Sequence, residues 1–109
     1  MNNISVRELK ALLDEQTDLV LLDVRRQAEA EVAVIHGSQL FPLDSIESGE
    51  SIEGIRSLAA GRTVYVHCKL GGRSARAVDL LTRFGIQAVN VVGGIDAWSQ
   101  EVDSSVPRY

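Results

Sequence analysis

The stretch Val64-Tyr-Val-His-Cys-Lys-Leu-Gly-Gly-Arg-Ser-Ala-Arg-Ala77 contains the strongest structural signal in the chain. An apolar strand pattern leads into Cys68, which is the only cysteine, and a glycine-rich turn then opens a helix. This order predicts a thiol surrounded by backbone N–H groups at a helix N-terminus. Such a site stabilises negative charge on the sulfur, or on an anion bound beside it.

The spacing within this loop narrows the chemistry. Four residues separate Cys68 from Arg73, whereas cysteine phosphatases use a His-Cys-x5-Arg-Ser/Thr loop that is one residue longer. A shorter ring suits a smaller guest, such as one extra sulfur atom, better than a phosphoryl group with three equatorial oxygens. We therefore predict that Cys68 is a nucleophile that accepts sulfur. The alternative is a buried structural cysteine, which the strand, glycine pair, arginine and helix start argue against.

The rest of the loop is predicted to bind the sulfur donor and the persulfide. The glycine pair permits backbone angles that turn N–H groups inward. Lys69 is expected to point outward and attract anionic donors or an acidic carrier protein, or to be a plain exposed lysine. Arg73 could anchor an anion, orient the loop through a salt bridge, or lie free on the surface. Ser74 is the expected N-cap of the next helix, with a hydroxyl that could reach the sulfur. These loop residues are Lys69, Leu70, Gly71, Gly72, Arg73 and Ser74.

Strand and helix signals alternate along the chain. Ser5 and Glu8 form a capping box before a helical apolar stripe. The remaining expected elements are a strand at 19–22, a helix at 27–32, a strand at 40–41, a helix at 51–60 capped by Gly61, a strand at 63–66, a helix at 74–84, a strand at 88–92 and a final helix containing Trp98. This pattern predicts an α/β fold in three layers, with a mostly parallel sheet of about five strands flanked by helices. In such sheets ligands bind at the C-terminal strand ends, where Cys68 lies.

Five motifs in the expected order resemble a rhodanese-type sulfurtransferase domain over nearly the whole chain. They are Asp23-Val24-Arg25 with Glu29, Ile35-His36-Gly37-Ser38, Phe41-Pro42-Leu43, the loop from Cys68 to Ser74, and Val92-Gly-Gly-Ile-Asp-Ala-Trp98. His36 stands where this family usually has proline, Ser38 where it has alanine, and Ala30 where an aromatic residue is common. The departures concern local packing rather than the loop around Cys68.

A narrower resemblance links His67–Ser74 and the ending Trp98–Tyr109 to the C-terminal rhodanese domain of MoeB/ThiF-type adenylyltransferases. It implies that the domain supplies persulfide sulfur to a ubiquitin-like sulfur-carrier protein whose C-terminus an adenylation domain activates. That pathway feeds molybdopterin or thiamin biosynthesis or tRNA thiolation. The sequence here contains no adenylation domain, so it is expected to be an excised domain or a stand-alone relative.

Three further positions are assigned to structural support. Asp23 and Arg25 share one face by the two-residue period of a strand, and could pair near the rim of the site or brace the loop. The family resemblance implies a mainly structural role for both. Glu29 is expected to contact Arg25 or a backbone amide. His67 is expected to be structural rather than a general base, and Trp98 to lie in the core.

Composition limits the remaining possibilities. With 109 residues and 45% hydrophobic content, the chain suits one domain, and 102–109 is expected to be an extended tail that folds back or leads away. The net charge of −4 and the lack of a basic patch argue against nucleic acid. One cysteine excludes an internal disulfide and a cysteine-rich zinc site. No metal and no cofactor beyond a persulfide on Cys68 is expected. Without a signal-peptide pattern or a long apolar run, we expect a cytoplasmic monomer rather than a membrane protein.

The sequence therefore favours a sulfurtransferase that takes sulfane sulfur from thiosulfate or a persulfide onto Cys68 and passes it to a thiophilic acceptor or carrier protein. Two alternatives stay open. One is a cysteine-dependent phosphatase or arsenate-reductase-like enzyme on the same fold. The other is a binding module that uses the fold without chemistry.

Overall fold

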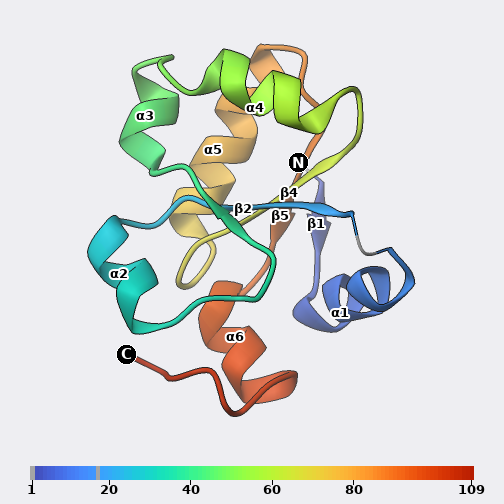
Figure 1. Cartoon of the computed structure of the whole chain (residues 1–109), viewed down its shortest axis with the longest axis vertical. Coiled ribbons are helices and arrows are strands. Elements are labelled where there is room, and N and C mark those ends of the chain that lie inside the picture. The colour runs from blue at the N-terminus through green and yellow to red at the C-terminus, as the bar shows by residue number, and fades with distance from the viewer. Residues whose placement is uncertain (1, 17) are drawn as a thin grey trace.

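The computed structural model, which describes residues 2–16 and 18–109, contains a parallel sheet between two layers of helices (Figure 1). Its strands pair in the order β1-β5-β4-β2-β3, and every pairing is parallel. This confirms the predicted parallel sheet of about five strands. The strands among the described residues are β1 (Asn3–Ile4), β2 (Val20–Asp23), β3 (Gln39–Leu40), β4 (Val64–His67) and β5 (Ala88–Val91).

Helices cover both faces of this sheet, as the alternating pattern predicted. In Figure 1, α3, α4 and α5 lie on one side of the strands, and α1 and α6 lie on the other. Over the described residues the helices are α1 (Val6–Glu15), α2 (Gln27–Val32), α3 (Leu43–Glu47), α4 (Ile52–Ala59), α5 (Gly72–Arg83) and α6 (Gly94–Glu101).

The core is divided by the sheet into two apolar clusters. Along β2, Leu22 joins the cluster beneath α3, α4 and α5, whereas Leu21 joins the cluster beneath α1 and α6. All four residues of β2 are buried, because a strand covered by helices on both faces has no solvent-facing side. Trp98 is buried in the second cluster, as predicted. Cys68 belongs to the first cluster.

Local sequence signals place several element ends correctly. Ser5 Oγ accepts the Glu8 N–H at 3.1 Å, and Glu8 Oε1 accepts the Ser5 N–H at 2.9 Å, so the predicted capping box is confirmed. The helix at 27–32 has the predicted bounds. Gly61 adopts the predicted left-handed conformation, with φ of +81°, but the C-cap of α4 is the preceding Ala60, which also has a left-handed φ of 50°.

Two elements have no periodic signal and were not predicted. β1 is two residues long and pairs with β5 through Asn3 and Asn90, so an alternating pattern cannot develop. α3 is five residues long, which is little more than one helical turn. β1 depends on pairing with β5, and α3 depends on packing against α5.

The C-terminal tail, residues 102–109, folds back toward α2 (Figure 1). The prediction of an extended tail is wrong for its first half, where the Val106 N–H donates to the Asp103 carbonyl at 3.1 Å in a turn. Val106 is buried, and the Ser99 hydroxyl donates to its carbonyl at 2.6 Å. The tail is therefore anchored to α6 before it reaches Tyr109.

Candidate active site

The candidate site lies where β4 ends. β4 is flanked by β2 and β5, and Cys68 follows it directly with 1% of its surface exposed. The next three residues, Lys69 to Gly71, turn into α5, whose N-terminal end faces the sulfur. The Gly71 N–H donates to Cys68 Sγ at 3.1 Å. The thiol is thus held near the positive end of a helix.

The two loop glycines differ in their roles. Gly71 has φ of +120°, which L-residues other than glycine rarely adopt, and this angle aims its N–H at the sulfur. Gly72 is the first residue of α5 with no positive φ, and a Cβ atom there would meet nothing within 4 Å. Of the two glycines expected to permit inward-turned N–H groups, Gly71 is the one whose N–H donates to the sulfur.

Ser74 is a side chain of the site rather than a helix cap. The N-cap of α5 is Gly71, so the predicted cap at Ser74 is wrong: α5 starts two residues earlier and buries Ser74 in its first turn. The Ser74 hydroxyl lies 3.3 Å from Cys68 Sγ and donates to Asn90 Oδ1 at 2.6 Å. Asn90 was missed by sequence reasoning, although a buried polar residue within the apolar strand β5 was the available signal.

The N-terminal turn of α6 fixes the loop from behind. The Ile95 N–H donates to the Cys68 carbonyl at 2.9 Å, and the Asp96 N–H donates to the Lys69 carbonyl at 3.1 Å. A Cβ atom on Gly94 would come within 2.4 Å of the Cys68 carbonyl oxygen. Glycine is required at this position because the loop backbone packs directly on it.

Arg73 is paired with Glu29 instead of lying free. Its two terminal nitrogens donate to Glu29 Oε1 at 2.5 Å and to Oε2 at 2.9 Å, which is the bidentate geometry favoured by arginine and carboxylate. The hydrogen bonds from Arg73 are the main reason that the pKa of Glu29 falls to about 2. Of the predicted roles for Arg73, the salt bridge is the one observed. The Glu29 carboxylate also accepts the Arg26 backbone N–H, as predicted, but its pairing with Arg73 was missed.

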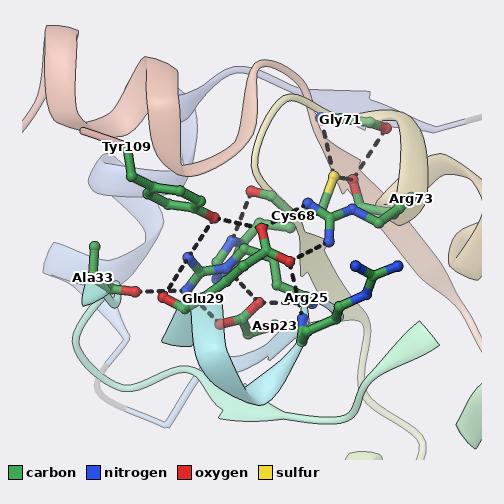
Figure 2. A network of polar contacts seen from close by, with 11 residues as sticks. Asp23, Arg25, Glu29, Ala33, Cys68, Gly71, Arg73 and Tyr109 are labelled. Carbon is green, nitrogen blue, oxygen red and sulfur yellow. Dashed lines mark hydrogen bonds and ion pairs between the residues drawn. The ribbon is translucent and has the colours of Figure 1, made fainter. Parts of the chain in front are cut away.

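Asp23 and Arg25 form the predicted pair beneath the site (Figure 2). The Arg25 guanidinium donates to Asp23 Oδ1 at 2.9 Å and to Oδ2 at 2.7 Å. Burial alone would lower the pKa of Arg25, but the hydrogen bond to Asp23 raises it overall. Arg25 also donates to the Ala33 carbonyl at 2.7 Å. The pair joins the end of β2 to the segment after α2.

His67 is the last residue of β4 and is fully buried. Its Nδ1 lies 3.2 Å from the Cys68 carbonyl oxygen, and its Nε2 has no hydrogen-bond partner among residues 2–16 and 18–109. Burial is the main cause of its lowered pKa, so the imidazole is held neutral. In contrast, His36 lies exposed in a turn, as expected.

The outer rim of the site is more open. The Leu70 side chain is 64% exposed, and the Lys69 ammonium lies 4.6 Å from the centroid of the Tyr109 ring. A cavity of about 370 Å³ beside Arg73 is bordered by both signs of charge, because Arg26, Asp44 and Glu47 also line it. Of the predicted loop residues, Gly71 and Ser74 contact the thiol, whereas Lys69, Leu70 and Arg73 face the rim and the cavity beside it.

The described residues hold no group of three or more histidine, cysteine or acidic side chains arranged to bind a metal ion. Within the same residues, no helix combines the length and the apolar character needed to cross a membrane.

Fold and site together define a parallel α/β domain with a buried free cysteine at the carboxyl end of its central strand. Residues 5–101 match the rhodanese-like domain family, and the chain belongs to this family. It is 38% identical over 109 residues to a Mycobacterium tuberculosis protein named probable adenylyltransferase/sulfurtransferase MoeZ, with coverage of 99% of this chain and 27% of that protein. The adenylyltransferase and sulfurtransferase MOCS3 of Bos taurus is 35% identical over 122 residues, with coverage of 97% and 27%.

Solved structures show the same fold. The crystal structure of a rhodanese-like domain protein from Staphylococcus aureus superimposes with a TM-score of 0.80 at 33% identity, and covers 100% of this chain and 99% of that one. The chain spans about a quarter of the length of the MoeZ and MOCS3 relatives. The family membership thus concerns the domain, and the MoeZ and MOCS3 relatives are named as sulfurtransferases.

Proposed function

We propose that this domain transfers sulfur, and that Cys68 carries the sulfur as a persulfide. The observation that supports this most directly is the position of Cys68 Sγ, which receives the Gly71 N–H at 3.1 Å and lies 3.3 Å from the Ser74 hydroxyl. A persulfide is an anion, and hydrogen-bond donors and a helix N-terminus around the sulfur favour it. The chemistry needs no resident cofactor or metal, because the covalent bond to Cys68 holds the sulfur.

The reaction has two steps. The Cys68 thiolate attacks the outer sulfur of a donor such as thiosulfate; a new S–S bond forms, the old one breaks, and sulfite leaves with the electron pair. In the second step an acceptor nucleophile attacks the terminal sulfur of the persulfide, and Cys68 leaves as thiolate. Ser74 can turn its hydroxyl hydrogen from Asn90 toward the sulfur when the anion forms, since both acceptors are within reach.

The pairing of Arg73 argues against the phosphatase alternative. A phosphoryl group carries its charge on three equatorial oxygens that need several donors. Both terminal nitrogens of Arg73 already donate to Glu29, and the loop is one residue shorter than the phosphatase loop. The arginine therefore braces the loop, and its pairing with Glu29 leaves fewer donors for a phosphoryl group.

The relatives suggest the physiological partners. MoeZ and MOCS3 are named as both adenylyltransferases and sulfurtransferases, and this chain corresponds to a quarter of each. We propose that a small sulfur donor loads Cys68, and that the acceptor is a ubiquitin-like sulfur-carrier protein activated by an adenylation domain. Lys69 and exposed Leu70 lie at the rim where such an acceptor would approach.

Intact-mass spectrometry tests the proposal. The reduced protein is incubated with thiosulfate, freed of small molecules and weighed beside the Cys68→Ser variant. We expect a gain of one sulfur, about 32 Da, on the wild type only, because the persulfide is a covalent cap on the thiol. Adding cyanide should return the original mass and release thiocyanate.

Two further arms separate the alternatives. A gain with a cysteine-persulfide donor but not with thiosulfate would keep sulfur transfer and change the donor. No gain with either donor would overturn the proposal, and hydrolysis of p-nitrophenyl phosphate that depends on Cys68 would then support the phosphatase. If neither donor adds mass and no phosphatase activity depends on Cys68, the result would support a binding module without chemistry.

A further inference from the structure

Tyr109 lies in the polar network beneath the candidate site, although it comes from the C-terminal tail. Its hydroxyl accepts a hydrogen bond from Arg25 Nη1 at 2.9 Å and donates to Glu29 Oε2 at 2.8 Å (Figure 2). With Tyr109, each of the five N–H groups of Arg25 has an acceptor: Asp23 Oδ1 and Oδ2, the carbonyls of Glu29 and Ala33, and the Tyr109 hydroxyl. The tail therefore completes the hydrogen bonding of a buried cation.

The same hydroxyl is connected to the active-site loop through one carboxylate. Glu29 Oε2 accepts from both Tyr109 and Arg73, and Glu29 Oε1 accepts from Arg73 and the Arg26 N–H. A carboxylate has about four acceptor positions, so four donors hold this one in a single orientation. Because Arg73 lies in the first turn of α5, that orientation also fixes the loop around Cys68.

The ring of Tyr109 contacts the other cation of the loop. The Lys69 ammonium is 4.6 Å from the ring centroid, within the range of a cation–π interaction. Lys69 follows Cys68 directly, so the ring holds a positive charge at the rim of the site. Burial is the main cause of the raised pKa of Tyr109, which keeps its hydroxyl protonated and donating.

Contacts with α6 hold the tail in place, so that the Tyr109 side chain has a defined position. Ser99 donates to the carbonyl of buried Val106, and Arg108 pairs with Asp96 at 3.0 Å. Asp96 is also the residue whose N–H holds the Lys69 carbonyl. The tail and the loop are thus anchored on the same turn of α6.

We propose that Tyr109 is a positioning residue for sulfur loading: its hydroxyl sets Arg73 through Glu29, and its ring holds the Lys69 ammonium where an anionic donor enters. This inference rests on the proposed sulfur transfer by Cys68. The two parts of the side chain have separable effects, on the loading step and on donor binding respectively.

Two substitutions separate these parts. Tyr109→Phe keeps the ring and removes the hydroxyl, so the single-turnover loading rate at saturating thiosulfate should fall about tenfold, the lower end of the effect expected for a lost hydrogen bond to a charged group. Tyr109→Leu also removes the ring. The half-saturating thiosulfate concentration should therefore be about two- to fivefold higher in Tyr109→Leu than in Tyr109→Phe, the range of an exposed cation–π contact. In a Lys69→Gln background, the step from Phe to Leu should have no effect on half-saturation.

The matched control is Tyr65→Phe, the same chemical change on the β4 segment away from Cys68. It should load sulfur at the wild-type rate. Thermal midpoints measured on all variants separate loss of fold from loss of positioning, because a purely structural role lowers the midpoint without changing half-saturation. Loading by Tyr109→Phe and Tyr109→Leu equal to that of the wild type would overturn the inference.

A second readout does not depend on sulfur transfer. Cys68 is alkylated with neutral iodoacetamide and with anionic iodoacetate, and the ratio of the two rates reports the charge at the entrance. We expect the iodoacetate to iodoacetamide ratio to fall about two- to fivefold in Tyr109→Leu and to stay near wild type in Tyr109→Phe. If the wild type accepts no sulfur but these ratios behave as stated, the sulfur-transfer proposal fails while the placement of Lys69 by Tyr109 stands. An unchanged ratio in Tyr109→Leu refutes that placement.

Discussion

At the residue scale, the hydroxyl of Ser74 is a side-chain group within hydrogen-bond distance of the Cys68 sulfur. It sits 3.3 Å from Cys68 Sγ and is itself oriented by Asn90. The hydroxyl can stabilise a charge that develops on the sulfur once its hydrogen rotates from Asn90 toward Sγ, with no movement of the oxygen. This explains why a serine is buried in the first turn of a helix whose cap is a glycine.

Ser74→Ala should therefore slow sulfur loading more than it destabilises the fold. We expect the single-turnover loading rate to fall about tenfold, the lower end of the effect of losing one hydrogen bond to a charged sulfur. Mass spectrometry on quenched time points measures it. Ser57→Ala, on the exposed face of α4, is the control and should load normally; equal rates in both variants would rule out a role for the Ser74 hydroxyl.

The Glu29–Arg73 pair predicts a specific acid sensitivity. The pKa of Glu29 is about 2 in the folded protein, below its ordinary value of 4.5. Its stabilising contribution is therefore complete above pH 4.5 and is lost as the pH falls toward 2. Urea unfolding at pH 6 and pH 3 should show a smaller loss of stability in Glu29→Gln than in the wild type.

The control for this experiment is Glu31→Gln on the same helix, whose side chain is exposed. It should keep the wild-type difference between pH 6 and pH 3. A wild-type-sized loss in Glu29→Gln would mean that other carboxylates cause the acid sensitivity.

At the element scale, the turn between β5 and α6 fixes the backbone of the Cys68 loop through hydrogen bonds. Gly93 and Gly94 both have positive φ, and the first N–H groups of α6 hold the Cys68 and Lys69 carbonyls. Since a peptide plane is rigid, fixing a carbonyl also fixes the direction of the attached N–H. The N-termini of two helices, α5 and α6, thus set opposite sides of one loop.

Gly94→Ala should disturb both the fold and the loop. The added Cβ would meet the Cys68 carbonyl oxygen at 2.4 Å, and alanine disfavours φ of +56°. We expect a destabilisation of about 1–3 kcal/mol by urea unfolding, with a lower loading rate in the remaining folded protein. Gly54→Ala, where a Cβ meets nothing within 4 Å inside α4, should instead stabilise by about 0.5–1 kcal/mol. Similar effects of both substitutions would refute the packing argument.

At the scale of the whole molecule, the sheet separates the site from the anchor of the tail. Cys68 lies in the cluster under α3, α4 and α5, whereas Val106 and Trp98 lie in the cluster under α1 and α6. The tail returns from the second cluster to the rim of the site through Tyr109. Packing on one face of the sheet is therefore connected to chemistry at its edge.

Val106→Ala should expose this connection. Removing two buried methyl groups costs about 1–2 kcal/mol, and the loosened tail should also raise the half-saturating thiosulfate concentration. Val32→Ala, at a valine that is 51% exposed on α2, should change stability by less than about 0.5 kcal/mol. If Val106→Ala lowered stability without any change in half-saturation, tail packing and donor binding would be independent.

The sequence by itself determined the features that rest on local chemistry and periodicity. The capping box at Ser5, the buried strand β2, the bounds of α2 and the strand-loop-helix unit around Cys68 all follow from residues close in the chain. Alternation of strands and helices then fixed a parallel sheet, and a parallel sheet fixed the edge at which Cys68 lies.

Only the tertiary structure decided how the site is braced. Glu29 meets Arg73 across 44 residues, and Tyr109 meets Glu29 across 80. No local pattern encodes such pairs, because several acidic residues could satisfy Arg73 equally well until the sheet brings α2 beside α5. The burial of Ser74 and the single essential loop glycine were likewise set by where α5 begins, and that depends on the packing of α6 against the loop.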